Sequence, residues 1–456
     1  MKHKGKRGQM LLASAAVLVV LTLVVVFVLS GMQDRALTER TAAAKAVGFP
    51  LTGQDLVPSI AFQPHENAGP VYERAISTLR ATVFTDRTAG ESAVFELHRR
   101  ELTAMEHAAL TTYLAEASPA IAEFKSATSM PYCYFEKDWD KGAAVTFPEF
   151  AKAKTLVKAL TAGAWLKARG GKLGEAEDDL LCALRAAAHF QEQPTLRATL
   201  VSTALEGTVS SALLHLLSED EAALAMVERV AQAMPEQWDL TLGLRAEAFS
   251  MFWMTRDNID LRRSIGLRPE DGFVPAVDLL QKNAIVRRSV RIAVLDAYTY
   301  LLRDYKPTGD ERTVLDAFDD FTMSISHAKT AAGVVFSAFG PRFRGLTASL
   351  DRARSRKTHL LAAVRVLEHR AKTGAWPTTL SEAGAEFEDP YDGSPLRFRL
   401  DGAGFRVWSV GEDGNNNGGL TREEANGAPS DEVLVYPGLQ SGAPFDEVLV
   451  YPGLFD

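Results

Sequence analysis

The feature that most constrains this chain is an uncharged apolar run near its N-terminus. Met10–Met32 comprises 23 residues and is rich in Leu and Val. As an α-helix, a run of that length spans about 34 Å, which is enough to cross the hydrocarbon core of a bilayer. Lys2, Lys4, Lys6 and Arg7 precede the run. A basic flank stays in the cytoplasm, so the remainder of the chain is expected outside.

A cleaved signal peptide is the alternative interpretation of the same run. The apolar core of a signal peptide usually has about 7–15 residues, so the length of this run favours an uncleaved anchor. The sequence therefore predicts a single-pass membrane protein with most of the chain outside the cytoplasm. The predicted parts are a basic cytoplasmic segment (1–9), a transmembrane anchor (10–32), a stem (33–50), an α-helical extracytoplasmic domain (51–345), a C-terminal module (346–440) and a duplicated terminal segment (441–456).

Composition narrows the classes of partner. The chain has 456 residues, of which 46% are apolar, so it can form a sizeable core. The net charge of −8 argues against nucleic acid, because phosphate binding requires a basic surface.

Cys133 and Cys182 are the only cysteines. Export would permit a disulfide between them, whereas the helical run around Cys182 favours a small buried thiol, and both interpretations stay open.

Helical periodicity dominates the middle of the chain, and long strand-like alternation is absent. Pro or Gly marks the expected breaks, at Ser118-Pro119, Gly170-Gly171, Gln193-Pro194, Met234-Pro235 and Lys306-Pro307. The expected helical segments are 67–82, 91–127, 150–169, 174–190, 195–217, 219–233, 237–256, 284–304, 310–328 and 345–373.

One pair of these segments carries small residues at spacings that let antiparallel helices approach closely. Ala164 and Ala168 lead through Gly170-Gly171 to Ala176 and Ala183. The pattern resembles a single tetratricopeptide unit. A solenoid needs at least three stacked repeats, and no second copy is evident, so an ordinary helical hairpin is the alternative.

Short alternating segments replace the helical pattern after residue 371. Leu396–Leu400 and Phe405–Val410 alternate in polarity around a Gly-containing turn at 401–404, which predicts a β-hairpin. Glu432–Tyr436 predicts a further strand.

The extreme C-terminus contains a tandem duplication. Gly427–Leu439 recurs as Gly442–Leu454 at a spacing of 15 residues, and the two copies differ only at Ser430 and Phe445. A small sheet has one place for this strand, so one copy should be redundant or should extend an edge of the sheet.

Between the predicted strands lies the stretch DGNNNGGLTREE (413–424), which has the spacing of a calcium loop. Calcium binds six to eight oxygens, and a twelve-residue loop supplies them from positions 1, 3, 5, 7, 9 and 12, with Gly at position 6. Gly418 occupies position 6. The candidate ligands are Asp413, Asn415, Asn417, the Gly419 carbonyl, Thr421 and Glu424.

The helices that flank an EF-hand loop are not predicted here. The loop follows a strand, and the residues after Glu424 are too few and too broken for a helix. Two Asn ligands also reduce the negative charge, which predicts weak binding. A solvated Asn/Gly-rich turn is the alternative interpretation.

The order of motifs around this loop resembles the C-terminal half of the major pseudopilin of type II secretion. The motifs that carry the resemblance are Lys372-Thr-Gly-Ala-Trp-Pro-Thr-Thr-Leu380, Asp389-Pro-Tyr-Asp-Gly-Ser-Pro-Leu396, Phe405-Arg-Val-Trp-Ser-Val-Gly-Glu-Asp-Gly414, Gly418-Gly419 and Asp431-Glu-Val-Leu-Val435. The match covers about 358–437. The resemblance implies that the last loop binds calcium and fixes the small sheet, with Asp413 and Asp431 among the ligands. Asp431 and Glu424 then compete as the closing ligand, and Asp446 could substitute for Asp431.

The chain also departs from that family. Some 300 helical residues separate the stem from the sheet, and the N-terminus lacks the Glu that most pilins carry five residues after the processing Gly, which would be Gly8 here. The layout also resembles that of membrane-anchored bacterial envelope proteins with a helical middle and this C-terminal module, a resemblance that implies no activity. The two resemblances imply that the anchor lies in the bacterial inner membrane, with most of the chain in the periplasm.

The expected fold is therefore mainly α, a helical-hairpin bundle with one tetratricopeptide-like pair, plus a small α+β pseudopilin-like sheet and one transmembrane helix. The expected role is binding or scaffolding of unidentified protein partners in the cell envelope, with a structural Ca²⁺. A pseudopilin-like subunit of a type II secretion or pilus-like assembly is the second hypothesis. An enzyme is the third, although no metalloprotease, nucleophile-elbow, phosphate-loop or dinucleotide motif occurs.

Overall fold

The computed structural model divides the chain into two compact units, each built from segments that are far apart in sequence. One unit comprises Met1–Val57, Asp138–Val145 and Leu244–Arg342, and the other comprises Pro58–Lys137, Thr146–Gly243 and Phe343–Asp456. Helices account for 68% of the structure, and one three-stranded antiparallel sheet accompanies them. The predicted mainly α fold with a small sheet is thus confirmed. The structure describes residues 3–59, 63–82, 89–97, 100–219, 221–257, 259–264, 274–307, 311–328, 330–340, 342–426, 430 and 432–436.

The first unit is built around one long helix and a group of shorter ones. Its elements are α1 (His3–Ala46), the 3₁₀ turns η1 (Gly53–Leu56) and η2 (Trp139–Ala144), most of α9 (Thr241–Trp253), α10 (Leu261–Ser264), α11 (Val274–Lys282), α12 (Ala284–Asp304), α13 (Glu311–His327) and α14 (Ala331–Phe339).

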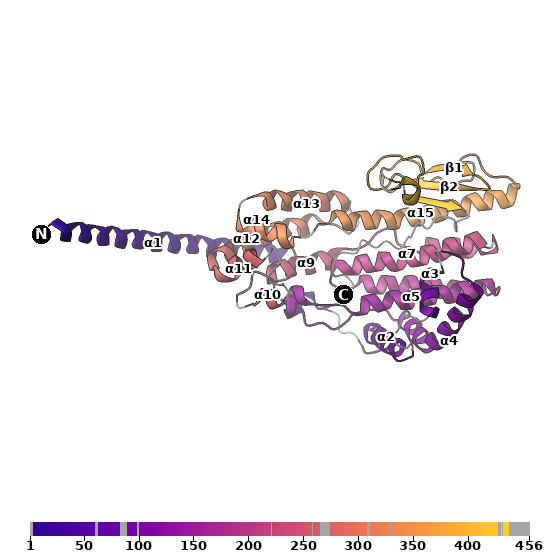
Figure 1. Cartoon of the computed structure of the whole chain (residues 1–456), viewed down its shortest axis with the longest axis horizontal. Coiled ribbons are helices and arrows are strands. Elements are labelled where there is room, and N and C mark those ends of the chain that lie inside the picture. The colour runs from indigo at the N-terminus through magenta and orange to yellow at the C-terminus, as the bar shows by residue number, and fades with distance from the viewer. Residues whose placement is uncertain are drawn as a thin grey trace. The chain divides into compact units, whose positions relative to one another are not determined.

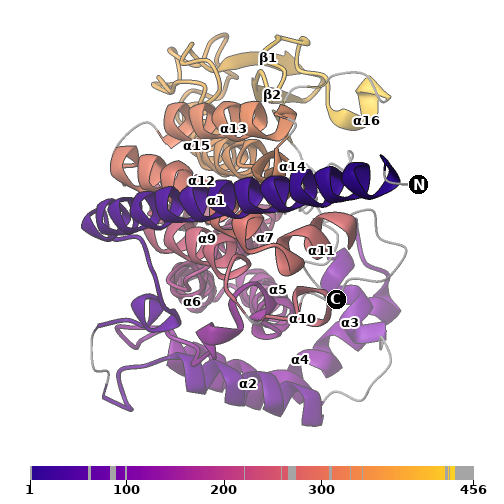
Figure 2. The same ribbon diagram turned by 90° about the vertical axis from the view of Figure 1, so that its left-hand side faces the viewer.

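Helix α1 joins the apolar run to the predicted stem without a break. Its N-terminal part extends away from α11 and α12, and its C-terminal part lies along α12 (Figures 1 and 2). Gln33 marks the transition, because its Nε2 donates to Ser289 Oγ at 2.7 Å and to the Ile285 carbonyl at 3.2 Å. Arg40 pairs with Asp296 at 2.9 Å two turns further along each helix.

The end of the stem is fixed within the same unit. The ring of Phe49 packs edge-on against Phe252, with centroids 5.7 Å apart, and Arg245 Nε donates to the Gly48 carbonyl at 3.0 Å. Gly142 has φ +52 and lies so close to the Trp253 ring that a Cβ would come within 2.1 Å of it. A side chain at position 142 would therefore displace that tryptophan.

The second unit contains the remaining helices and the sheet. Its elements are α2 (Gly69–Thr82), α3 (Ala89–Glu96), α4 (Ala104–Ala127), α5 (Glu149–Arg169), α6 (Leu173–Gln191), α7 (Leu196–Glu219), η3 (Glu221–Ala223), α8 (Leu224–Gln232), α15 (Arg344–Thr373), β1 (Arg397–Asp401), β2 (Gly404–Ser409), α16 (Arg422–Ala425) and β3 (Glu432–Tyr436).

Two details of the predicted helices are corrected by the structure. The single helix expected over 91–127 is two helices, because Thr103 and Glu106 form a capping box that starts α4. Pro119, expected at a break, lies inside α4. A proline inside a helix loses one backbone hydrogen bond and crowds the carbonyl four residues earlier. The buried Ala117, Ala120 and Phe124 on either side of Pro119 offset this cost by holding α4 in the core.

Helix α7 is long and apolar enough to cross a membrane by length and composition, and among the described residues it alone passes that test. It is 78% buried within the structure over its most apolar window. It packs against α5, α6, α8 and α15. Its hydropathy therefore reflects a position at the centre of the second unit.

The sheet has the order β1-β2-β3, with β2 pairing antiparallel to both neighbours. The predicted hairpin is confirmed, with Leu400 opposite Phe405. The sheet lies along α15 (Figure 1), and its inner side chains Phe405, Val407, Leu434 and Tyr436 belong to the same apolar core as the helices. Helix α15 therefore packs against the helical bundle on one side and against the sheet on the other.

Both cysteines are free thiols buried in the second unit. Cys133 is 3% exposed and Cys182 is 8% exposed. The structure thus agrees with the buried-thiol interpretation.

The second copy of the C-terminal duplication, Gly442–Leu454, lies outside the described residues.

Candidate metal centre

The C-terminal sheet is approached through a sharp end of α15. Gly374 caps the helix in the left-handed conformation, with φ +77, and its N–H donates to the Arg370 carbonyl at 2.8 Å. The Arg370 guanidinium then lies 4.1 Å from the centre of the Trp376 ring. The glycine and the tryptophan of the Lys372–Leu380 motif thus reverse the chain and cover the helix end.

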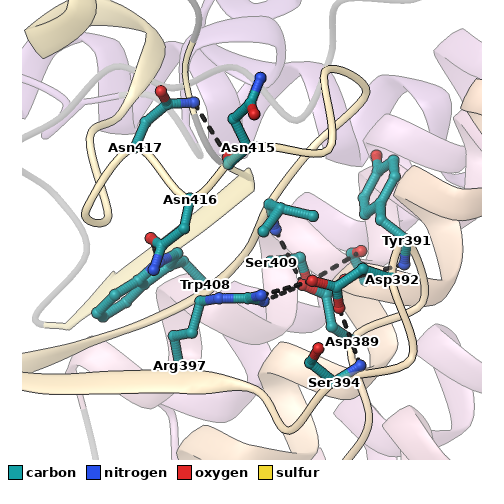
Figure 3. Close-up of polar contacts among 12 residues, drawn as sticks. Asp389, Tyr391, Asp392, Ser394, Arg397, Trp408, Ser409, Asn415, Asn416 and Asn417 are labelled. Atoms are coloured by element: carbon teal, nitrogen blue, oxygen red, sulfur yellow. Dashed lines mark hydrogen bonds and ion pairs between the residues drawn. The ribbon is translucent and has the colours of Figure 1, made fainter.

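Asp389 is the buried centre of the turn that precedes β1. Its carboxylate accepts from the backbone N–H groups of Tyr391 and Val410, both at 2.9 Å, and from the Arg397 guanidinium. Its own N–H donates to the Ser394 carbonyl at 2.7 Å. Figure 3 shows these donors converging on one side chain. Asp389, which is 0% exposed, therefore joins the turn, β1 and the end of β2.

Helix α15 is tied to the sheet by polar contacts as well as by apolar packing. His359 Nε2 lies 2.9 Å from Ser409 Oγ, and Ser355 Oγ donates to the same oxygen at 3.3 Å. Complete burial lowers the pKa of His359 to about 4, so the imidazole is neutral at neutral pH. Near the start of the loop, Arg352 pairs with Glu432 on β3 at 3.0 Å and with Glu412 at 2.6 Å.

The first three candidate ligands lie together in one exposed turn. The Asp413 carboxylate accepts from the Asn415 backbone N–H at 3.0 Å and from Asn417 Nδ2 at 3.3 Å. Asn415 Nδ2 donates to the Asp413 carbonyl at 3.2 Å. These hydrogen bonds, the backbone one first, hold the pKa of Asp413 below its usual range. The turn thus gathers one ionised carboxylate with two amide side chains.

Asn416, between these ligands, points the other way, towards the sheet. Its Oδ1 accepts from Trp408 Nε1 at 3.1 Å and from the Gly418 N–H at 3.0 Å. Figure 3 shows the Asn416 side chain beside the Trp408 ring. The central Asn of the run is therefore a structural anchor that fixes the turn on β2.

The last three candidates of the twelve-residue pattern lie around a guanidinium. Arg406 Nη1 donates to the Gly419 carbonyl at 3.0 Å, and both its terminal nitrogens bind the Glu424 carboxylate, at 2.5 and 2.7 Å. Glu424 also accepts from the Thr421 N–H at 2.9 Å, while Thr421 Oγ1 accepts from the Glu424 N–H at 3.3 Å. Chiefly through Arg406, these bonds lower the pKa of Glu424 to about 2.

The structure therefore brings the predicted ligands together as two groups. Asp413, Asn415 and Asn417 form the first, whereas Gly419, Thr421 and Glu424 form the second with Arg406 at its centre. Asp431 lies outside the described residues. Within the ranges that the structure describes, no three His, Cys, Asp or Glu side chains converge as a metal centre would require.

The chemistry of the first group suits calcium, since it offers carboxylate and amide oxygens that are exposed to an approaching ion. Rotation of the two amides would exchange their nitrogens for oxygens. In the second group, the Gly419 carbonyl and the Glu424 carboxylate already accept hydrogen bonds from the Arg406 guanidinium. Glu424 could become a ligand only if Arg406 released it. Sequence spacing did not reveal this partner, because Arg406 comes from β2, outside the loop.

The chain matches no known protein family, no curated protein and no solved structure with which it was compared. The resemblance to the pseudopilin module therefore stays a prediction from the motifs.

Proposed function

We propose that this chain is a membrane-anchored binding or scaffold protein of the bacterial envelope, with its bulk in the periplasm and a structural calcium site in the C-terminal module. The observation that carries the proposal is the continuity of α1. The helix runs from the basic N-terminus through the apolar segment into contact with α12.

The exposure of the apolar segment supports insertion into a bilayer. Large apolar side chains of this segment are exposed on different sides of the helix. Their exposed fractions are 57% for Leu21, 52% for Val24, 80% for Phe27 and 45% for Leu29. An apolar surface on every side of a helix is stable in lipid and costly in water. Gln33 begins the polar contacts with α12 immediately after the last apolar residue, Met32. The membrane surface would thus lie close to the start of α12.

A structural role for calcium follows from the position of the loop. The Asp413 turn is fixed through Asn416 to Trp408 on β2, and it leads to β3, which the ion would secure. Asp413, Asn415 and Asn417 would hold the ion, with Asp431 as the closing ligand that the family resemblance implies. No acid–base pair accompanies these residues in the described part of the loop, so we assign the ion no catalytic step.

The pseudopilin-like hypothesis differs from this proposal in the fate of the N-terminus. A pseudopilin-like subunit would be cleaved after Gly8 and would assemble through the apolar segment. An anchored scaffold would keep Met10–Met32 and the basic flank. Mass spectrometry of the mature N-terminus, on protein extracted from membranes, distinguishes the two.

The anchor is tested by membrane extraction and topology. The full chain should stay with the membrane in alkaline carbonate and dissolve only in detergent. A reporter enzyme that is active only in the periplasm should be active when fused after residue 426. Replacing Val24 and Val25 with Asp should release the protein, whereas the same replacements at the exposed Arg35 and Glu39 of the stem should not. Release of the unaltered chain by carbonate would reject the proposal.

Calcium binding is tested by thermal unfolding of the full chain in detergent, with calcium and with chelator. If the dissociation constant is about 0.1 mM, as in extracellular modules, 1 mM calcium would stabilise the folded module by roughly 1.4 kcal/mol. Asp413→Ala should abolish the shift, and Glu388→Ala, which removes an exposed carboxylate before β1, should retain it. No shift at 10 mM calcium would leave the loop as a polar turn.

A further inference from the structure

The place of β3 in the sheet is filled by a segment that the chain contains twice. Leu434 is 1% exposed in the common core. Tyr436 stacks on Phe405 with ring centroids 5.1 Å apart and an interplanar angle of 17°. Glu432 pairs with Arg352 of α15 at 3.0 Å. These contacts define a slot for one strand, formed by β2 and α15.

The second copy carries the same side chains in the same order. Glu447, Leu449 and Tyr451 correspond to Glu432, Leu434 and Tyr436, and the two intervening valines also recur. Since the five residues are identical, each strand contact of β3 is available to the second copy. The packing inside the slot therefore cannot distinguish one copy from the other.

The topology permits an exchange without rearranging the rest of the sheet. Among the residues that the structure describes, β3 pairs with β2 alone, so removing it leaves the β1–β2 hairpin intact. The two arrangements differ in the connection from β2, which is 15 residues longer for the second copy. Loop closure depends weakly on length, so the longer connection disfavours the second copy by only about twofold.

We propose that the slot between β2 and α15 is a binding site for the Glu-Val-Leu-Val-Tyr segment, and that the two copies within one chain compete for it. The copy outside the slot presents the same strand-forming side chains as the copy inside. The inference does not depend on the calcium site or on the membrane anchor, because it rests on the contacts of β3 and on the identity of the two segments.

A thiol in the second copy reports its entry into the slot. The experiment uses the full chain in detergent, with Cys133→Ala and Cys182→Ala to remove the native thiols. Leu449→Cys is labelled under native conditions, first alone and then together with Leu434→Asp. A buried carboxylate is strongly disfavoured, so Leu434→Asp expels the first copy. Labelling at position 449 should then slow by at least about tenfold, as expected for a thiol that reacts only on local opening.

The matched control is Leu400→Asp, which places the same charge on a leucine that is 45% exposed in β1. It should leave labelling at position 449 unchanged. Leu434→Ala, which keeps an apolar strand, should slow the labelling in the same direction as Leu434→Asp and by a smaller factor.

Two results would overturn the inference. In the first, labelling at position 449 proceeds at the rate measured in denaturant and is unaffected by Leu434→Asp. In the second, protection appears but grows with protein concentration, which would make the occupant a strand from another copy of the chain. Protection that is independent of concentration and requires Leu434→Asp or Leu434→Ala supports competition within one chain.

Discussion

The guanidinium of Arg406 holds both carboxylate oxygens of Glu424, at 2.5 and 2.7 Å, and the Gly419 carbonyl at 3.0 Å. One side chain from β2 thus occupies two of the acceptors that the loop spacing assigns to calcium. The positive charge of Arg406 lies where the second half of a twelve-residue calcium loop would direct its oxygens.

The first prediction follows from this ion pair. Glu424→Gln should change the calcium affinity by less than about threefold, because the carboxylate is bound to Arg406. It should lower the free energy of unfolding by roughly 1 kcal/mol, the scale of a partly exposed pair. Calcium titration by calorimetry, with Asp413→Ala as the comparison, measures the affinity, and urea unfolding without calcium measures the stability. A loss of affinity as large as that of Asp413→Ala would make Glu424 a ligand.

The second prediction concerns Asp389. Asp389→Asn removes the charge that faces Arg397 and weakens the hydrogen bonds from the N–H groups of Tyr391 and Val410. The expected loss is roughly 3 kcal/mol, because the Arg397 guanidinium loses its fully buried partner. Asp392→Asn is the control, since that carboxylate is 29% exposed and also contacts Arg397; its cost should stay below about 1 kcal/mol. Equal losses in urea unfolding would contradict the central role of Asp389.

The third prediction is a dependence of stability on acid pH. Burial lowers the pKa of folded His359 to about 4, below its value in the unfolded chain, so the unfolded state takes up the proton first. The contribution of neutral His359 to the free energy of unfolding is complete above about pH 6.5. It falls by up to roughly 1.4 kcal/mol per pH unit towards pH 4. His359→Gln, which can still bond Ser409, should flatten the slope. An unchanged slope in that variant would show that other groups cause it.

The fourth prediction concerns Glu206, a buried carboxylate on α7. Ser202 Oγ and Trp238 Nε1 donate to its Oε1, at 3.0 and 3.3 Å, and burial raises its pKa to about 7. Its contribution to stability is complete below about pH 4.5 and is lost as the pH rises through 7. Glu206→Gln should therefore stabilise the chain by roughly 1–3 kcal/mol at pH 8 and change little at pH 4. Glu175→Gln, on an exposed carboxylate, should have no such effect.

The slopes of Glu206 and His359 have opposite signs and overlap between about pH 4.5 and 6.5. In the unaltered chain these two contributions should consequently offset each other in part there. The His359 slope is best measured in the Glu206→Gln background, where the opposing slope of Glu206 is absent. A steep profile in the unaltered chain and a flat one in that background would contradict both assignments.

Local patterns were sufficient for much of the fold. Periodicity located most of the helices, and the alternation around 401–404 located the hairpin, because both depend on neighbours close in sequence. The sequence also contains the capping box at Thr103, as Thr-x-x-Glu, which marks the start of α4 within 91–127. The break predicted at Pro119 is wrong because the packing of its neighbours keeps α4 continuous. A local sequence pattern contains no information on that packing.

The candidate site was less accessible from sequence. Spacing identified Asp413, Asn415 and Asn417, which are close in the chain and share a turn. The motif that contains Asp389 does not indicate its role, since its partner Val410 lies 21 residues away. Glu424 was assigned to calcium because its pairing with Arg406, across a strand and a loop, has no signature in the loop itself.

By itself the sequence determined the apolar run, the helical character of the middle, the hairpin, the oxygen-rich loop and the duplicated strand. These are consequences of composition and short-range periodicity. Only the tertiary structure decided that α15 and the sheet share one core with α5–α7, that both cysteines are buried thiols, and that Arg406 takes Glu424. Those outcomes depend on contacts between side chains that are distant in sequence. Such contacts form because a buried charge is costly without a partner and because exposed apolar surface is costly in water.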